Sequence, residues 1–183
     1  MIQIRQPPRL TGWFSLTTDN RQLTNFMRKL ILILTAIFAT GLLFVNVYTS
    51  VVDARNWGSD IPNSLMAARA YMSVANPGNF FRVVSPMSQV IALLALIICW
   101  RAGTRVRVYC AIALVLAVSV DLLTFAYFYP RNDIMFVAPL NPDTEVLKTA
   151  WTGWTTVNWL RSGILAVQVI IDYLALLRIA KAG

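Results

Sequence analysis

Apolar residues in this chain gather in four long blocks, separated by polar or proline-containing segments. The blocks cover about residues 30–52, 83–100, 106–129 and 155–179. An α-helix needs about 20 predominantly apolar residues to cross the hydrocarbon core of a bilayer, and each block approaches or exceeds that length. The pattern therefore predicts an all-α, four-helix transmembrane bundle within residues 29–183.

The polar stretch of residues 1–28 precedes the first block and is expected to be a cytoplasmic extension without a domain of its own. The first block is not expected to be a cleavable signal peptide. It begins too late, it is too long, and it lacks small residues at a cleavage position.

The two longer segments between blocks are each predicted to contain helical structure. Residues 61–75 have the composition of a short helix, and the run Asn76-Pro77-Gly78-Asn79 is expected to end it. Pro130 is expected to break the third block. The irregular stretch that follows contains Pro139, Asn141 and Pro142, and Asp143 is expected to cap a new helix at Thr144.

The positive charges predict how the chain is oriented in the membrane. Ten arginines and lysines precede the first block, fill the turn between the second and third, or follow the fourth. The two remaining loops hold five cations and five acidic residues, so they are balanced. Because cytoplasmic loops carry an excess of Lys and Arg, both termini are expected in the cytoplasm, with a bacterial inner membrane as the expected location. The ten residues are Arg5, Arg9, Arg21, Arg28, Lys29, Arg101, Arg105, Arg107, Arg178 and Lys181.

Composition excludes several classes of protein. The chain is 57% hydrophobic and 13% charged, whereas a soluble domain is usually about 45–50% apolar and about 25% charged. An ordinary soluble enzyme, a disordered tail and a disulfide-stapled secreted module are therefore excluded. The net charge of +8 lies mostly beside the apolar blocks and contains no basic run, so no nucleic-acid partner is expected.

Residue counts also restrict the chemistry. The chain contains no histidine, which excludes bis-His haem, His-ligated copper or zinc, and carboxylate–His di-iron sites. Cys99 and Cys110 are not spaced as metal ligands and flank a turn expected in the reducing cytoplasm, so free structural thiols are expected. No metal or other cofactor is predicted.

A polar stripe runs along the fourth block. Its residues follow one another at spacings of 4, 3, 4, 3 and 4, which places them on one face of a helix. They are Trp154, Asn158, Arg161, Leu165, Gln168 and Asp172. A charge inside a bilayer needs a partner, and Asp121 lies at a similar depth at a rise of about 1.5 Å per residue. A buried Asp121–Arg161 ion pair is therefore predicted, with Asp172 left for a separate inner contact.

Polar residues of the other blocks gather at the same depth, in the half of the membrane expected to face outward. They are Asn46, Thr49 and Asp53 in the first block, Arg82, Ser85 and Gln89 near the second, and Thr124 with Tyr127 or Tyr129 in the third. Apolar walls are expected from Phe44, Phe125, Phe128 and Trp154. Mostly apolar walls with a few convergent polar groups are typical of a small-molecule site.

A structural interpretation stands beside this one. Membrane helices use Asn, Gln, Ser and Thr to hold neighbouring helices together, so Asn46, Gln89 and Gln168 suit that role. An Asp121–Arg161 pair can also specify packing without chemistry. Arg82 and Arg131 can extend to the membrane surface.

The second half of the chain carries the motif that resembles a known family. Thr124 near the end of the third block is followed by Pro130-x-Asn132, and then by Trp154-x3-Asn158-x2-Arg161. This order resembles the DUF1772 or anthrone-oxygenase-like family of integral membrane proteins. The resemblance covers about residues 30–180, and its specific motifs lie in the second half.

The resemblance implies, for a few relatives, oxidation of anthrones to anthraquinones without metal or flavin. Such chemistry needs a base for an acidic C–H and donors that stabilise the resulting enolate. By this resemblance Arg161 and Asn158 are the candidates to hold the oxyanion, and Asp121 or Asp133 is the candidate base. The candidate substrate-binding residues are Trp154, Thr124, Tyr127, Asn132 and Asn46, with Tyr129 as a further stacking ring.

Three classes of function are therefore considered. The first is a protein that binds a small apolar or aromatic metabolite, including an oxygenase. The second is a non-enzymatic accessory subunit of a membrane complex or homo-oligomer, in which the polar residues only organise the bundle. The third is a transporter or channel. A self-contained transporter is disfavoured because the chain shows no inverted repeat and no pair of Gly/Pro-broken spans, whereas a pore formed by several copies stays open. A cavity lined by Asn158 and Arg161 would favour the first class over the second.

Overall fold

The computed structural model describes residues 12–137 and 143–182. Regular structure in these ranges is helical throughout, which confirms the prediction of an all-α bundle. Four helical segments are long and apolar enough to cross a membrane. They are Asn20–Trp57, Pro77–Ile98, Thr104–Val137 and Thr144–Lys181.

The spans are built from α-helices and from short π-helices, labelled η, which have a wider turn. The first span comprises α1 (Gly12–Tyr48), η1 (Thr49–Asp53) and α2 (Ala54–Trp57). After α3 (Asn63–Tyr71) come α4 (Pro77–Ile98) and α5 (Thr104–Leu123). The third span then continues through η2 (Thr124–Phe128), α6 (Tyr129–Asn132) and η3 (Asp133–Val137), and the fourth is α7 (Thr144–Ala182).

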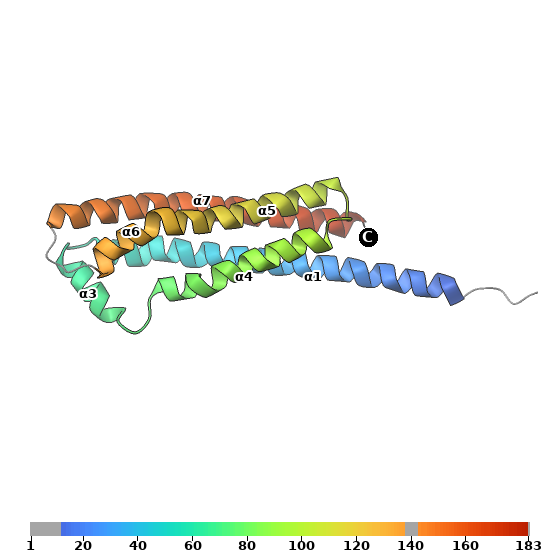
Figure 1. Ribbon diagram of the computed structural model, residues 1–183, viewed down its shortest axis with the longest axis horizontal. Coiled ribbons are helices and arrows are strands. Elements are labelled where there is room, and N and C mark those ends of the chain that lie inside the picture. The colour runs from blue at the N-terminus through green and yellow to red at the C-terminus, as the bar shows by residue number, and fades with distance from the viewer. Residues whose placement is uncertain (1–11, 138–142, 183) are drawn as a thin grey trace, which may run out of the picture.

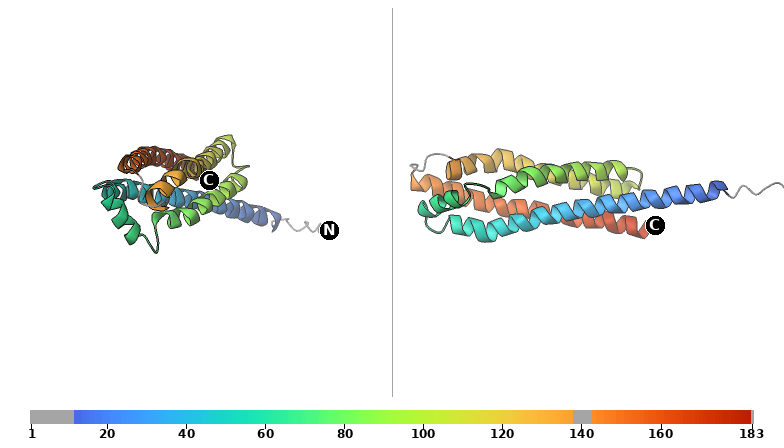
Figure 2. Two further views of the ribbon diagram at one scale, coloured as in Figure 1. Left: turned by 60° about the vertical axis from the view of Figure 1, so that its left-hand side comes forward. Right: turned by 90° about the horizontal axis from the view of Figure 1, so that it is seen from below.

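The four long helices form one elongated bundle (Figure 1). Helix α7 packs against α1 and α5, and α4 packs against the same two helices. Helices α3 and α6 lie at one end, here called the α3 end, whereas the α4–α5 turn and the C-terminus lie at the other. The N-terminal part of α1 extends past the bundle at that second end (Figures 1 and 2).

Small residues let the helices approach one another closely. Ala39, Ala92, Ala95, Ala117 and Ala175 are all at most 5% exposed. Large apolar side chains such as those of Phe44 and Val115 point outward instead, with 69% and 66% exposure. This distribution is expected of a bundle in lipid, because helices there associate through close packing rather than by removing apolar area from water.

The second span begins earlier than its apolar block. The Asn76 side chain accepts a hydrogen bond from the Asn79 amide, and the Asn79 side chain accepts one from the Asn76 amide. Pro77 occupies the first turn, where its missing N–H costs nothing. The run expected only to end the preceding helix therefore begins α4, while α3 already ends at Tyr71.

Pro130 does not break the third span as predicted. The preceding turn is the π-helix η2, in which the Tyr129 amide donates to the carbonyl of Thr124, five residues earlier. A proline normally removes the bond to the carbonyl four residues before it, and the wider turn accommodates this loss. The helical path therefore runs on to Val137.

Helix α7 begins where the sequence predicts. The Asp143 carboxylate accepts a hydrogen bond from the Glu145 amide at 3.1 Å, and the first helical residue is Thr144. Pro139, Asn141 and Pro142 lie outside the described residues. Helix α1 begins at Gly12, so it includes part of the stretch predicted as a polar extension.

Candidate functional site

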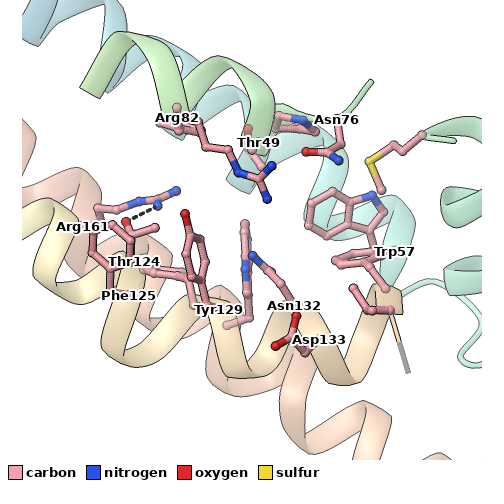
Figure 3. Close-up of a pocket in the computed structure, with 18 of the residues that line it drawn as sticks. Thr49, Trp57, Asn76, Arg82, Thr124, Phe125, Tyr129, Asn132, Asp133 and Arg161 are labelled. Carbon is pink, nitrogen blue, oxygen red and sulfur yellow. Dashed lines mark hydrogen bonds between the residues drawn. The ribbon is translucent and has the colours of Figure 1, made fainter. Parts of the chain in front are cut away.

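A pocket opens at the α3 end of the bundle, between the first half of α4 and the segment η2–α6–η3 (Figure 3). Its volume is about 490 Å³, and residues of η1, α2 and α7 complete its walls. We call it the aromatic pocket because most of its large side chains are rings. These are Trp57, Phe81, Phe125, Phe128, Tyr129, Phe136 and Trp154.

The rings pack against one another at the wall nearest α2. Trp57 makes edge contacts with Phe136 and Trp154, with centroids 5.0 and 5.3 Å apart. Phe128 contacts Trp154 in the same way at 5.4 Å. Edge-to-face pairs of this kind hold their members in one orientation, so this wall is formed before any ligand arrives.

Arg161 of α7 is the most deeply buried charge in the aromatic pocket, with 4% of its surface exposed. Its Nε donates to Asn46 Oδ1 at 2.7 Å, and one terminal nitrogen donates to Thr124 Oγ1 at 3.4 Å. The guanidinium carbon lies 4.3 Å from the Phe128 ring centroid and 4.8 Å from that of Phe81. Neutral acceptors and ring faces therefore fix the group in place.

Asn46 and Asn158 form a polar network between α1 and α7 beside Arg161. Asn46 Nδ2 donates to the Asn158 carbonyl at 3.0 Å and to Ser162 Oγ at 2.7 Å. Asn158 Nδ2 donates to Ser50 Oγ at 2.6 Å. Both asparagines are fully buried and neither lines the aromatic pocket. They therefore hold α1 to α7, and Asn46 in addition positions Arg161.

Asp121 and Arg161 do not form the predicted ion pair. Asp121 instead accepts hydrogen bonds from Ser85 Oγ at 2.5 Å and from Gln89 Nε2, both on α4. Ser85 and Gln89 are four residues apart, so both reach the same carboxylate from one face of α4. The Asp121 carboxylate thus joins α4 to α5. Asp121 and Arg161 nevertheless both line the aromatic pocket.

The other predicted site residues divide into two groups. Trp154, Thr124 and Asn132 line the aromatic pocket, as do the candidate base Asp133 and the ring of Tyr129. Among the predicted substrate-binding residues, Tyr127 and Asn46 do not line it.

Two aromatic residues that the sequence predicts for the site, Tyr127 and Phe44, lie outside the pocket. The Tyr127 hydroxyl donates to the Gly153 carbonyl at 3.3 Å, and the Arg131 guanidinium lies 3.4 Å from its ring centroid. Phe44, expected as a wall, points outward because it lies on the face of α1 away from the other helices.

Several pocket residues were not identified as such from the sequence. Trp57, Asn76 and Phe136 come from segments outside the apolar blocks, and Phe81 lies in the added first turns of α4. Arg82 was predicted among the polar residues of the site, with extension to the membrane surface as the structural alternative. It lines the pocket, and Figure 3 shows its guanidinium in the space between Arg161 and Trp57, although the residue as a whole is exposed.

The last two polar residues of the stripe on α7, Gln168 and Asp172, do not line the aromatic pocket. Gln168 and Asp172 are 1% and 2% exposed. Gln168 Oε1 and Nε2 and Asp172 Oδ2 have no hydrogen-bond partner in the structure. Asp172 therefore lies apart from the pocket, as expected, and its carboxylate contacts the Thr35 side chain of α1, although Oδ2 has no partner among the described residues.

Cys99 and Cys110 are buried free thiols. Nowhere in residues 12–137 and 143–182 do three or more cysteine, aspartate or glutamate side chains gather as metal ligands would. The polar side chains that line the pocket are those of arginine, aspartate, asparagine, serine, threonine and tyrosine, and most of its large apolar side chains are aromatic rings.

Comparison with known proteins finds no family model that matches the chain, and no match among curated proteins or solved structures. The resemblance to the DUF1772 or anthrone-oxygenase-like family therefore stays a prediction based on the motif of its second half.

Proposed function

We propose that this membrane protein binds a small aromatic or apolar metabolite in the aromatic pocket. One observation carries the proposal: Arg161 is held rigidly at the edge of a preformed, ring-lined cavity of about 490 Å³. Small-molecule sites are typically about 300–1,000 Å³, mostly apolar, and contain a few fixed polar groups. The aromatic pocket has each of these properties.

Intrinsic fluorescence tests this proposal directly, because Trp57 and Trp154 line the pocket. Titrating the detergent-purified protein with anthrone should quench its tryptophan emission saturably. Trp57→Phe and Trp154→Phe should each remove part of that quenching. The matched control is Trp159→Phe, because Trp159 is 51% exposed and outside the pocket. Quenching that is non-saturable, or that depends only on Trp159, would contradict binding in the pocket.

A cofactor-free oxygenase is the more specific candidate, favoured by the carboxylate of Asp133 in the same pocket as Arg161. Asp133 accepts no hydrogen bond from any described residue, whereas Asp121 already accepts two. Asp133 is therefore the better base of the two. It would remove a proton from an activated CH₂ group while Arg161 holds the resulting enolate oxygen.

The reaction balances with oxygen as the oxidant. The enolate transfers an electron to O₂, and the two radicals combine into a carbon–oxygen bond. The peroxide anion formed in this way takes back the proton held by Asp133, and the resulting hydroperoxide loses water to leave a ketone. Overall, CH₂ and O₂ become C=O and H₂O, and no electron is needed from a cofactor.

Oxygen uptake with a panel of anthrones tests this second candidate. Uptake by the wild type should be saturable, and both Arg161→Gln and Asp133→Asn should reduce it strongly while retaining a folded melting transition. Uptake at the spontaneous rate would leave the protein as a binder only. Equal uptake by Arg161→Gln would show that the reaction occurs elsewhere.

An accessory subunit of a membrane complex is the alternative function. It is favoured by the Asn46–Asn158 network, which joins α1 to α7 although neither asparagine lines the pocket. If no aromatic compound binds, this alternative replaces both candidates above.

A further inference from the structure

Two of the arginines that line the aromatic pocket, Arg82 and Arg161, form no ion pair with any described residue. Three arginines, Arg69, Arg82 and Arg161, line it, together with two aspartates, Asp121 and Asp133. Among the described residues, the ion pair formed is Lys148–Glu145, which lies outside the pocket. Neither Arg82 nor Arg161 therefore has a carboxylate partner within the part of the chain that the structure describes.

The two aspartates do not supply this missing partner. Asp121 is engaged by Ser85 and Gln89 of α4, and Asp133 is exposed at the beginning of η3. An arginine in a low-dielectric surrounding is costly unless an anion or several acceptors compensate it. For Arg161 the described residues provide two neutral acceptors and two ring faces, but no carboxylate within ion-pair distance.

The remaining hydrogen-bonding capacity of Arg161 faces the cavity. Its Nε and one terminal nitrogen are used by Asn46 and Thr124, and the second terminal nitrogen makes no hydrogen bond to a described residue. Arg82 enters the same space from α4, on the opposite wall (Figure 3). The Tyr129 hydroxyl points toward that space as well. The two arginines thus face one volume from different helices.

We propose that the aromatic pocket selects an anionic ligand, whose acidic group lies between Arg161 and Arg82 while its apolar body lies against Trp57 and Trp154. This inference rests on the proposed function, since it assumes that the pocket takes a ligand. Guanidinium groups bind carboxylate and phosphate oxygens through paired hydrogen bonds. The ligand class is therefore an amphiphilic oxyanion with a planar or otherwise compact apolar body.

A pair of probes of the same shape tests the inference. The carboxylate probe is 9-anthracenecarboxylate, and its neutral counterpart is 9-anthracenemethanol, each titrated into protein in an uncharged detergent at constant ionic strength. The carboxylate should bind roughly tenfold more tightly or better, as expected for charge-assisted hydrogen bonds. Arg82→Gln and Arg161→Gln should each reduce this preference, and Arg82→Lys should retain most of it.

The control variant is Arg55→Gln. Arg55 is exposed on α2 at the same end of the bundle but does not line the pocket, so the preference should be unchanged. Arg82 is also exposed, which makes Arg82→Gln a usable test even where Arg161→Gln fails to fold.

The outcomes separate this inference from the proposed function. Equal binding of both probes would overturn the anion preference while leaving an aromatic binding site. Binding of neither probe, with no quenching by anthrone, would overturn both. A preference that persists in Arg82→Gln, or that falls equally in Arg55→Gln, would show that the two arginines do not form the site.

Discussion

At the scale of single residues, Asn46 connects the packing of the bundle to the pocket. Its carbonyl oxygen accepts from Arg161 Nε, while its amide nitrogen donates to Ser162 Oγ and to a carbonyl of α7. One buried side chain therefore both orients a charge and joins α1 to α7. An aliphatic residue of similar size would serve neither purpose.

Asn46→Ala is expected to lower stability by roughly 1–3 kcal/mol, because it leaves buried polar atoms without partners. It should also weaken the binding of 9-anthracenecarboxylate, since Arg161 loses its strongest contact. A thermal-unfolding series in one detergent measures the first effect and a titration the second. Asn56→Ala is the control, because Asn56 is exposed and its side chain makes no described hydrogen bond. A variant as stable as the wild type would show that the network is dispensable.

Replacement of Asp121 and of Asp172 by asparagine is expected to affect the unfolding midpoint differently. Asp121 accepts two hydrogen bonds, whereas Asp172 Oδ2 is buried without a partner one turn from an equally unpartnered Gln168 amide. Asp172→Asn should therefore leave the unfolding midpoint unchanged or raise it, because an amide can pair with Gln168 across one turn. Asp121→Asn should lower it. A large loss of stability in Asp172→Asn would contradict this expectation and show that the contact of the carboxylate with Thr35 stabilises the bundle.

At the scale of elements, the ends of the spans shape the pocket. The capping pair Asn76–Asn79 extends α4 beyond its apolar block, and this extension carries Phe81 and Arg82 into the wall. The π-helix η2 lets the third span continue past Pro130, which brings Asn132, Asp133 and Phe136 to the opposite wall. Part of each wall thus comes from residues outside the predicted apolar blocks.

The contact between α2 and α7 depends on a glycine. A Cβ atom on Gly58 would lie 2.2 Å from the indole of Trp151, whose Nε1 donates to the Ala54 carbonyl at 2.7 Å. Gly58→Ala should therefore displace Trp151 and lower the unfolding midpoint. Gly41→Ala is the matched control, because a Cβ there meets no atom within 4 Å and alanine favours a helix interior. Equal midpoints for the two variants would contradict the close approach at Gly58.

At the scale of the whole molecule, charge and shape together define two unlike ends. Arg101 lies in the α4–α5 turn and Arg105 and Arg107 in the first turn of α5, whereas the α3 end carries the aromatic pocket. The excess of positive charge at cytoplasmic loops predicts that the pocket faces away from the cytoplasm.

Labelling of an introduced cysteine in intact bacterial cells that express the protein tests this orientation. Ser59→Cys is at the α3 end and Thr104→Cys in the α4–α5 turn, and both positions are exposed. A membrane-impermeant maleimide should label Ser59→Cys in intact cells and Thr104→Cys only after lysis. The wild type should remain unlabelled because Cys99 and Cys110 are buried. The reverse pattern would place the pocket on the cytoplasmic side.

The sequence by itself determined the class of the protein and the placement of its spans. Length and hydropathy suffice for this, because every helix that crosses a bilayer needs about 20 predominantly apolar residues. The stripe on α7 was also predictable, since residues three and four apart share one helix face. Asn158, Arg161 and Trp154 were therefore correctly placed on one side of one helix.

The tertiary structure alone decided how these residues are partnered. Depth along a helix made Asp121 the expected partner of Arg161, but depth does not specify which neighbour lies closer around the bundle axis. In the folded bundle Ser85 and Gln89 donate hydrogen bonds to Asp121, whereas Asn46 and Thr124 accept hydrogen bonds from Arg161. The positive charge of the pocket, which carries the proposal of an anionic ligand, follows from that packing and from no local pattern in the chain.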